Sequence, residues 1–495
     1  MRGVGFFVRT PRALPTQMID GDVLLARGWP KGPLIGRALA LYAEQTAAGV
    51  PDADALGLLG RVYEHPAAVT AGEAGFELAQ AVIEHRHVPE PVAVRDEPLD
   101  VPVWGRDLID DAAVRQMHDA MRLPVAVAGA LMPDAHVGYG VPIGGVVALD
   151  GAVAPYMVGV DIACRMMLSV YPGDALSYLD DGPRRDALKA ALRRETRFGI
   201  GARFKPGSRR EHAVLDDGAW GATPLLQSLK DKAHAQLGTS GTGNHFVDAG
   251  RLDVDARGAE ALGLAPGVYF AVLTHSGSRG VGATIADRYS KLAREATPLP
   301  KELQALAWLG LDTELGQEYW TSMELAGRFA SACHHTIHAA LGAALGLEPE
   351  AQVENHHNFA WKETHEVGGE PREVVVHRKG ATPAGDGVLG VVPGSQGHPS
   401  YVVRGRGSAA SLWSASHGAG RQMGRKHALR VLSRDERDAW LAERGVELLA
   451  GGLDEAPQAY KDIDEVLALQ ADLAEPVAAF RPEVVLMASD GKSEG

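Results

Sequence analysis

The spacing of apolar residues changes near residue 105. In residues 32–49 and 72–87, apolar side chains recur every three or four positions between glycines, a period that predicts amphipathic helices. Residues 85–105 are rich in proline and charge, which is typical of a linker. We therefore expect an α-rich N-terminal segment over residues 1–95, separate from the rest of the chain.

Beyond the linker, short apolar runs alternate with glycine-dense loops. Such runs predict strands whose loops bring the backbone close to a ligand. The runs lie at residues 139–149, 267–280, 372–381, 387–397 and 399–405. Apolar residues return to helical spacing around 319–345 and 421–446. We expect an α+β fold with one large catalytic domain over residues 96–488 and a flexible tail at 489–495.

The composition is that of a globular protein, with 45% hydrophobic and 23% charged residues in a chain of 495. Two cysteines cannot build a disulfide framework, which favours a reducing compartment. The first residues lack a signal-peptide pattern, and no apolar run approaches the length of a membrane span. We therefore expect a cytoplasmic protein without a membrane partner.

Acidic residues outnumber basic ones, 63 to 49, so the formal net charge is −14. This balance argues against a protein that coats nucleic acid, because phosphate binding needs clustered cations. A local exception is residues 193–210, where lysines and arginines surround two phenylalanines. Cations bind phosphates and aromatic rings stack on bases, so this segment is either a nucleic-acid contact or a solvated loop.

Histidines concentrate in short loops of glycine, serine and asparagine at the ends of apolar runs. A single loop histidine is usually a hydrogen-bonded surface residue, but here the pattern recurs along the chain. Glycine permits close approach of the backbone, and neutral donors from asparagine and serine suit a site that holds metal and phosphate together. The histidines concerned are His136, His245, His275, His356, His357, His377 and His417.

Cys164 lies in the stretch VGVDIACRMM, three residues after Asp161. A lone cysteine usually packs as a small apolar side chain, yet these two residues and three of the loop histidines would also form a metal-binding set. A thiolate can bridge two cations, and a carboxylate with a thiolate supplies two negative charges. Mixed oxygen, nitrogen and sulfur ligands leave manganese, zinc, iron and cobalt open. The set is Asp161, Cys164, His245, His275 and His357.

A nucleoside triphosphate would have to bind without the usual phosphate loop. The tail stretch DGKS has Leu486 where that motif needs its first glycine, and no G-x-G-x-x-G follows a convincing strand. The loops VPGSQG and SHGAGR offer backbone N–H groups instead. His417 in the second loop is the best candidate nucleophile, because a neutral imidazole can attack an α-phosphate to form a phosphoramidate.

Such a histidine needs a carboxylate on its other ring nitrogen, and Asp134 in the stretch MPDAH is the candidate. Arg421, Arg425 and Lys426 come after His417 in the chain and would compensate phosphate charge. The simpler alternative is that HGAGR forms only a tight turn before a helix.

Taken in order, these stretches resemble the RtcB family of RNA-splicing ligases. The resemblance covers roughly residues 100–488 and is carried by MPDAHVGYGVPIGG, GVDIAC, GTGNHF, HSGSRG, HHN, HRKGAT, PGSQG, SYVV, SHGAGR and YKDID. It implies that family's catalytic domain of mixed β-sheets and flanking helices. It also implies an enzyme that uses GTP and two Mn²⁺ ions to join an RNA 3′-phosphate or 2′,3′-cyclic phosphate to a 5′-hydroxyl. RNA repair and tRNA splicing are the implied settings, with an archease-like activator as a further partner.

Carried over to this chain, the resemblance makes Cys164 a thiolate that bridges both metal ions. Asp161 and His245 would complete one metal shell, and His275 and His357 would complete the other.

The resemblance also makes His417 the residue that takes the guanylate, while Asp134 holds its ring. The residues that would contact the guanine nucleotide are Asn244, Phe246, Asp248, Asn358, Pro393, Gly394, Ser395, Gln396, Ser400, Gly418, Ala419, Gly420 and Tyr460.

The chain departs from the family pattern in ways that make it a divergent member. Ala163 and Arg165 flank the cysteine in place of glycines, Asp248 stands in place of a glutamate, and Ala488 stands where a lysine is usual. Two other functions stay open. One is a metal-dependent phosphodiesterase or phosphatase, in which the same metal shell activates water. The other is a protein that caps a 3′-phosphate or binds RNA ends without ligation.

Overall fold

The computed structural model describes residues 19–86 and 92–488, and the chain divides after residue 90 into two compact units. The described part of the first unit contains the helices α1 (Gly21–Ala26), α2 (Pro33–Ala47), α3 (Asp52–Glu64) and α4 (Phe76–Arg86). Their apolar faces share a core that includes Leu24, Leu59 and Val82. The helical N-terminal segment expected from the periodicity is confirmed.

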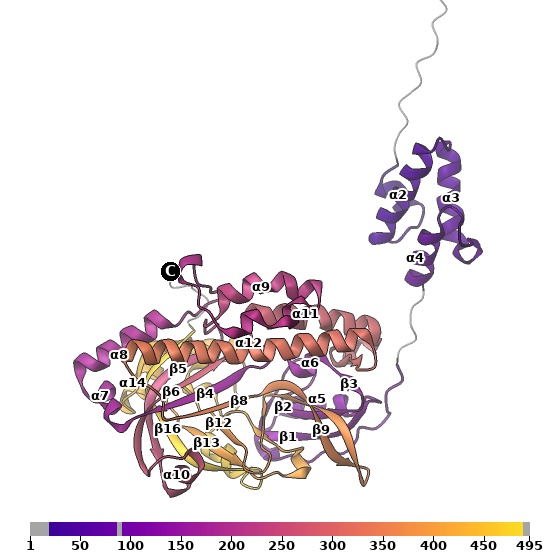
Figure 1. Ribbon diagram of the computed structural model, residues 1–495. Coiled ribbons are helices and arrows are strands. Elements are labelled where there is room, and N and C mark those ends of the chain that lie inside the picture. The colour runs from indigo at the N-terminus through magenta and orange to yellow at the C-terminus, as the bar shows by residue number, and fades with distance from the viewer. Residues whose placement is uncertain (1–18, 87–91, 489–495) are drawn as a thin grey trace, which may run out of the picture. The chain divides into compact units, whose positions relative to one another are not determined.

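Two large sheets form the frame of the second unit (Figure 1). The smaller is antiparallel, in the order β1 (Ala126–His136), β2 (Ile143–Leu149), β10 (Glu370–Lys379) and β9 (Asn358–Val367). The larger has the order β12 (Leu389–Val392), β13 (Ser400–Gly405), β16 (Ala474–Met487), β5 (Phe246–Val254), β6 (Gly267–Ser276), β4 (Arg165–Tyr171) and β8 (Ala351–His356). A short strand, β15 (Glu447–Ala450), pairs with β16 in parallel.

The larger sheet curls so that its two end strands approach each other. The side chain of Asn355 in β8 accepts a hydrogen bond from the Val391 N–H of β12 (2.8 Å) and donates one to the Val391 carbonyl (3.3 Å). Apolar side chains such as Leu168, Val402 and Phe480 fill the inner face. The curl gives this sheet an enclosed face, and its ends can hold polar groups away from solvent.

Helices cover the outer face of the larger sheet. The long helix α12 (Glu314–Leu345) contacts β4 and β6, and α11 (Arg279–Ala296) packs between it and α9 (Pro224–Gln236) (Figure 1). The helix predicted around 319–345 is thus present, and it extends five residues further toward the N-terminus. The remaining helices are α5 (Asp111–Met121), α6 (Pro155–Val158), α7 (Ser177–Asp180), α8 (Gly182–Glu195), α10 (Ala256–Leu262), α13 (Arg425–Val431), α14 (Arg434–Glu443) and α15 (Ile463–Ala468).

Two local expectations were wrong. The helical stretch at 421–446 is broken into α13 and α14, because Ser433 adopts an extended conformation and its side chain caps the second helix by accepting from the Glu436 N–H. Residues 92–105, expected as part of a linker, pack along the second unit. The Arg95 N–H donates to the Arg122 carbonyl (2.8 Å), and Val101 packs against the core.

Two small sheets complete the frame: β3 (Ala152–Val153) pairs with β7 (Leu309–Gly310), and β11 (Ala381–Pro383) pairs with β14 (Ser414–Ser416). The mixed architecture confirms the expected α+β class. Among the helices of residues 19–86 and 92–488, none combines the length and the apolar character needed to cross a lipid bilayer.

Candidate active site

Four of the five predicted metal ligands lie at one edge of the larger sheet. Strands β5, β6, β4 and β8 are neighbours in that order and run antiparallel, so the start of one lies beside the end of the next. Cys164 precedes β4, His245 precedes β5, His275 lies near the end of β6, and His357 comes directly after β8. Strand order therefore brings together residues that are far apart in the sequence.

The ligand atoms form two groups that share one sulfur. Cys164 Sγ lies 3.1 Å from His275 Nε2, which in turn lies 3.2 Å from His357 Nε2. On the other side, Cys164 Sγ lies 3.3 Å from His245 Nε2, and His245 Nε2 lies 3.0 Å from Asp161 Oδ2. Within each group of three, the potential ligand atoms all lie within 4.8 Å of one another.

Backbone carbonyls set the orientation of two of these rings. Nδ1 of His275 lies 3.1 Å from the Asn244 carbonyl oxygen, and Nδ1 of His245 lies 3.0 Å from the Ser240 carbonyl oxygen. An imidazole that donates its Nδ1 proton to a carbonyl, as His275 does, keeps a lone pair on Nε2, the form that binds metals; Nδ1 of His245 also lies 3.0 Å from the donor Arg279 Nη1. Burial lowers the pKa of His275 to about 3, so its ring is neutral at physiological pH.

The acidic members of the set also suit a cation. Burial alone would raise the pKa of Asp161, but its hydrogen bond to His245 and the charges of His245 and Arg279 lower that pKa to about 2. Burial and the nearby Asp161 carboxylate raise the pKa of the Cys164 thiol well above its usual value. The cluster thus gathers several lone pairs at the wall of a cavity, an arrangement that a divalent cation stabilises.

The backbone around Cys164 and Asp161 is tightly specified. Ala163 has a positive φ of 56°, and its N–H donates to the Asn358 carbonyl (2.6 Å). Gly277, two residues after His275, lies so close to Asp161 that a Cβ there would come within 2.3 Å of the carboxylate oxygens. The glycine of the HSGSRG stretch therefore leaves room for Asp161 beside the histidines.

His417 comes directly after β14, and Asp134 holds its ring. Asp134 lies in β1 and is fully buried. One carboxylate oxygen, Oδ2, accepts from Nδ1 of His417 (2.7 Å) and from the His417 backbone N–H (3.1 Å). No described residue hydrogen-bonds Nε2 of His417, whose ring centroid lies 5.0 Å from that of His357. The second imidazole nitrogen is thus kept for a partner outside the chain, next to the metal-ligand groups.

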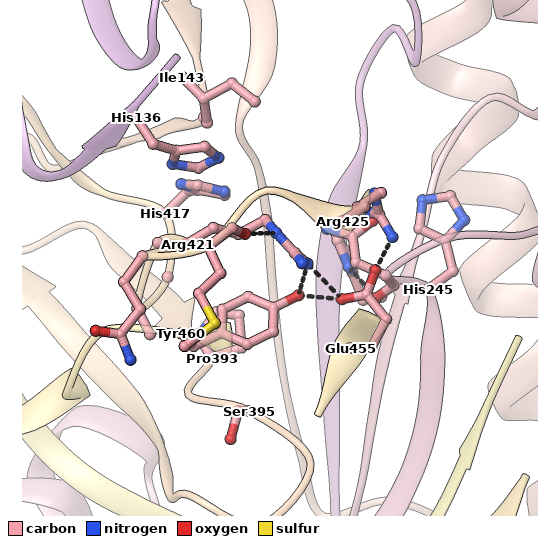
Figure 2. A pocket seen from close by; sticks show the side chains of 18 of the residues that line it. His136, Ile143, His245, Pro393, Ser395, His417, Arg421, Arg425, Glu455 and Tyr460 are labelled. Carbon is pink, nitrogen blue, oxygen red and sulfur yellow. Dashed lines mark hydrogen bonds and ion pairs between the residues drawn. The ribbon is translucent and has the colours of Figure 1, made fainter. Parts of the chain in front are cut away.

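The predicted nucleotide residues gather around a single cavity of about 900 Å³. All thirteen of them line it, as do His417 and the five predicted metal ligands. Asp134 is the one predicted site residue that does not line it, because it lies behind His417. Figure 2 shows part of this cavity, with His417 between His136 and Arg421.

Comparison with known proteins identifies the domain that carries this cavity. The family model described as "tRNA-splicing ligase RtcB" matches residues 116–488, three quarters of the chain. The chain belongs to the RtcB family. The tRNA-splicing ligase RtcB of Thermococcus kodakarensis is 33% identical over 465 residues, which cover 78% of this chain and 95% of that protein.

Two bacterial relatives agree. The RNA-splicing ligase RtcB of Escherichia coli K12 is 32% identical over 416 residues, covering 78% of this chain and 97% of the relative. The RtcB ligase of Mycobacterium tuberculosis is 32% identical over 432 residues, covering 74% of this chain and 98% of the relative. The resemblance seen in the motifs is confirmed: the protein is an enzyme, an RtcB-family RNA ligase. Residues 19–86 lie outside the matched region.

One end of the RtcB cavity contains buried oxygens without partners. Asp248 lies in β5, accepts from the Leu486 backbone N–H, and its pKa is raised well above the usual value by burial. Its Oδ1 and the Oε1 of Gln396 accept no hydrogen bond from described residues. Buried polar atoms are rarely left without a partner, so these oxygens suit a ligand that brings N–H donors.

Arg421 and Arg425, which follow His417 in the chain, form ion pairs with carboxylates of the same domain. Arg421 Nη1 lies 3.1 Å from Glu455 Oε2 and 3.2 Å from the Tyr460 hydroxyl, and Arg425 pairs with Glu455 and Asp454 (Figure 2). Their charge is thus largely compensated by carboxylates of the RtcB domain. Arg421, Arg425 and Lys426 all line the cavity, so the expectation that they compensate phosphate charge stays a prediction. The ion-pair network also fixes the wall of the cavity that holds Tyr460.

A second cavity of about 850 Å³ reaches the same metal-ligand groups from another side. It shares Asp161, Asn244 and His245 with the first, and Arg279 and Lys232 line it. Arg279 Nη1 donates to the Ser240 carbonyl (3.2 Å), the same oxygen that orients His245. Arg279 carries no prediction from the sequence, although its place four residues after His275 in HSGSRG was a usable signal.

The basic segment 193–210 was only partly understood from its sequence. Phe204 is 6% exposed, and the guanidinium groups of Arg197 and Arg210 lie over its ring at 5.5 and 4.6 Å from the centroid. Phe198 packs against a core cluster. The ring of Phe204 is therefore not available to stack on a base, while the choice between a nucleic-acid contact and a solvated loop stays open for the segment as a whole.

Besides His417, three of the loop histidines lie outside the metal-ligand groups. His136 lines the main cavity and its Nδ1 lies 3.1 Å from the Asp134 carbonyl oxygen. His356 points away from its neighbour His357 and its ring packs at 4.9 Å from Trp361. His377 lies inside β10, where its Nε2 accepts from the Ala154 N–H.

Proposed function

We propose that this RtcB-family ligase joins RNA 3′-phosphate or 2′,3′-cyclic phosphate ends to 5′-hydroxyl ends through a guanylylated His417. The observation that carries the proposal is the pairing of His417 Nδ1 with the buried Asp134 at 2.7 Å, beside the metal-ligand groups and in one cavity with the nucleotide loops. The named relatives are tRNA- or RNA-splicing ligases.

In the first step, the lone pair on His417 Nε2 attacks the α-phosphorus of GTP. A nitrogen–phosphorus bond forms, the bond from the α-phosphorus to the bridging oxygen of the β-phosphate breaks, and pyrophosphate leaves with that electron pair. The proton on Nδ1 stays on the ring, where the Asp134 carboxylate stabilises the positive charge that the imidazole acquires.

The two metal-ligand groups favour two divalent cations that share Cys164, as the family resemblance implies. Bound there, such ions would neutralise charge on the α-phosphate and on the departing pyrophosphate. The choice of Mn²⁺ rests on the resemblance, because this ligand set also accepts zinc, iron and cobalt. Cys164 would bridge, with Asp161 and His245 on one side and His275 and His357 on the other.

In the next two steps, an RNA 3′-phosphate oxygen attacks the guanylate phosphorus, and the bond to His417 breaks. The RNA 5′-hydroxyl then attacks the activated RNA phosphate, releasing GMP and a proton. A 2′,3′-cyclic phosphate end must first be opened by water to give the 3′-phosphate. Two RNA ends and a nucleotide must meet for this chemistry, and two cavities meet at the metal-ligand groups.

Guanine is the base that the end of the main cavity favours. Its N1–H and exocyclic amino group are donors, and Asp248 Oδ1 and Gln396 Oε1 are buried acceptors without partners among described residues. The remaining predicted contacts, including Ser395 and Ser400, line the same cavity.

The test is incubation with labelled GTP and Mn²⁺, then intact-mass analysis. The protein should gain one guanylate that is lost in acid and absent from His417→Ala. His234→Ala is the matched control, because His234 pairs with Glu211 at the surface and lines neither cavity. Phosphate release from RNA ends without any adduct would instead support the alternative phosphatase function. An adduct formed equally well with ATP would overturn the assignment of guanine.

A further inference from the structure

The loop between β1 and β2 carries an aromatic side chain that the proposed reaction does not use. Tyr139 is 80% exposed, and among the described residues it is the one tyrosine or tryptophan that counts as an exposed large hydrophobic side chain. It also lines the main cavity. Aromatic rings contribute large apolar areas and usually lie at least half-buried. An exposed ring at the wall of a catalytic cavity therefore suggests a partner that is not part of the chain.

The loop holds the backbone of Tyr139 in a fixed place. Gln116 of α5 accepts from the Gly138 N–H (2.9 Å) and donates to the Gly138 carbonyl (2.6 Å). The ammonium group of Lys379, at the end of β10, donates to the carbonyls of Tyr139 and Tyr156. The exposure of the ring is thus a property of an anchored loop and not of a loose one.

The position of this loop leaves it free for RNA. Figure 2 shows His136 and Ile143, which flank the loop, on one side of His417, and Pro393 and Ser395 of the nucleotide loops on the other. A nucleotide that binds along Pro393 and Ser395 would lie on the other side of His417 from His136 and Ile143 in this view. Lys426 and Arg430 line the same cavity and can meet the phosphates of a strand that enters it.

We propose that Tyr139 is a stacking platform for the terminal nucleobase of an RNA end brought to His417. This inference rests on the proposed function, because it assumes that RNA is the substrate. Every base has a π-face, so stacking on a tyrosine tolerates any sequence while fixing how deep the strand lies in the cavity. That property suits a ligase that must position an RNA end by its terminus.

The first experiment compares Tyr139→Ala with Tyr139→Phe. The Ala variant should bind a short 3′-phosphate or 5′-hydroxyl RNA about tenfold more weakly in a fluorescence-anisotropy titration without GTP, as expected for one stacked base. The Phe variant should bind within about twofold of the wild type, because it keeps the ring. Val388→Ala is the matched control, since Val388 is also exposed but lines neither cavity.

The second experiment removes the base instead of the ring. On an RNA whose 3′-terminal or 5′-terminal nucleotide is abasic, the wild type should lose the same factor of about ten, and Tyr139→Ala should lose nothing more. The end that shows this non-additivity is the end that Tyr139 contacts. Equal affinity of wild type and Tyr139→Ala for intact RNA, or additive losses at both ends, would overturn the proposal.

Guanylylation of His417 separates this inference from the function on which it rests. The extent of labelling by GTP should be the same in Tyr139→Ala and wild type, because the proposal places an RNA base, and not the guanine nucleotide, on the ring. Normal labelling with unchanged RNA affinity would refute the stacking role alone. Absence of labelling in the wild type would refute the proposed reaction, while the affinity series would still decide whether the ring binds RNA.

Discussion

Two groups of buried histidines lie back to back across strand β6, and they serve different purposes. Thr274 and His275 are consecutive, so their side chains point to opposite faces of the sheet. On one face, His275 meets His245 and His357 beside Cys164. On the other face, Thr274 meets two histidines of the covering helix α12.

The α12 group is closed by hydroxyls. The Thr274 hydroxyl lies 2.6 Å from His334 Nδ1 and 2.8 Å from His338 Nε2, and the Ser169 hydroxyl lies 2.8 Å from His338 Nδ1. Each hydroxyl can donate one proton and accept another, so three of the four ring nitrogens are paired within this group, and only His334 Nε2 has no partner among the described residues. In the other group, ring nitrogens and the thiol face each other directly, with no hydroxyl between them.

The comparison teaches that burial and pKa do not distinguish a metal site from a structural one. Burial lowers the pKa of His338 and of His275 alike, to about 3 in each. What differs is the balance of donors and acceptors. The α12 group is bonded mainly through hydroxyls, whereas in the group with Cys164 the ring nitrogens and the thiol meet without a hydroxyl, and a divalent cation would take up their surplus lone pairs.

The largest expected effect comes from removing the thiol that the two metal-ligand groups share. Cys164→Ala removes a ligand from both metal groups, so metal-dependent guanylylation should fall by more than about 100-fold, the loss seen when only a supporting partner of a ligand is removed. The fold should persist. Rates with Mn²⁺ and circular dichroism check both points. Cys333→Ala, a change at the other buried cysteine, is the control. Activity retained in Cys164→Ala would mean that the thiol only packs.

A second expectation concerns the pH dependence of metal binding to the group with Cys164, and it needs no mutation. Because the pKa of Cys164 is raised in the metal-free protein, metal binding must displace its proton. Below the thiol pKa the free protein holds one more proton than the complex, so apparent affinity should rise about tenfold per pH unit. Calorimetry in two buffers of different ionisation enthalpy measures the proton released. An affinity that is flat between about pH 6 and 8 would contradict this.

The smallest effect is expected in the α12 group. Thr274→Val keeps the shape of the side chain but leaves two buried ring nitrogens without their hydroxyl, which should lower the free energy of unfolding by about 1–3 kcal/mol. Metal affinity should not change. Chemical denaturation and metal titration of the same variant provide the two readouts. A large loss of metal affinity with unchanged stability would mean that the two groups are coupled through β6.

Much of the site could be predicted because its residues sit in recognisable loops. The three histidine ligands and His417 occur beside glycine, serine or asparagine at strand ends, and this short-range pattern is enough to find them. The loop pattern alone gives no reason to choose His357, as the predicted set does, over His356, whose ring packs on Trp361, or over His377, which accepts from Ala154 within the core. The contacts of these side chains depend on residues that are distant along the chain.

For the fold, too, local pattern predicted regular elements but not features that depend on single capping residues or distant partners. The helix at 319–345 was predictable from its long, regular period, whereas the break between α13 and α14 depends on one capping residue, Ser433. The pairing of Arg421 and Arg425 with Glu455 joins positions about thirty residues apart, and no local pattern encodes it. The boundaries expected at residues 95 and 488 stay predictions.

The arrangement of the ligands on separate strands has a consequence during synthesis. The ligand that precedes β4 emerges from the ribosome long before the one that comes after β8, and the residue proposed to carry the guanylate emerges last. A growing or truncated chain therefore offers a metal only fragments of its eventual coordination sphere. If His417 carries the guanylate as proposed, the capacity to activate a nucleotide arises only after most of the polypeptide has been made.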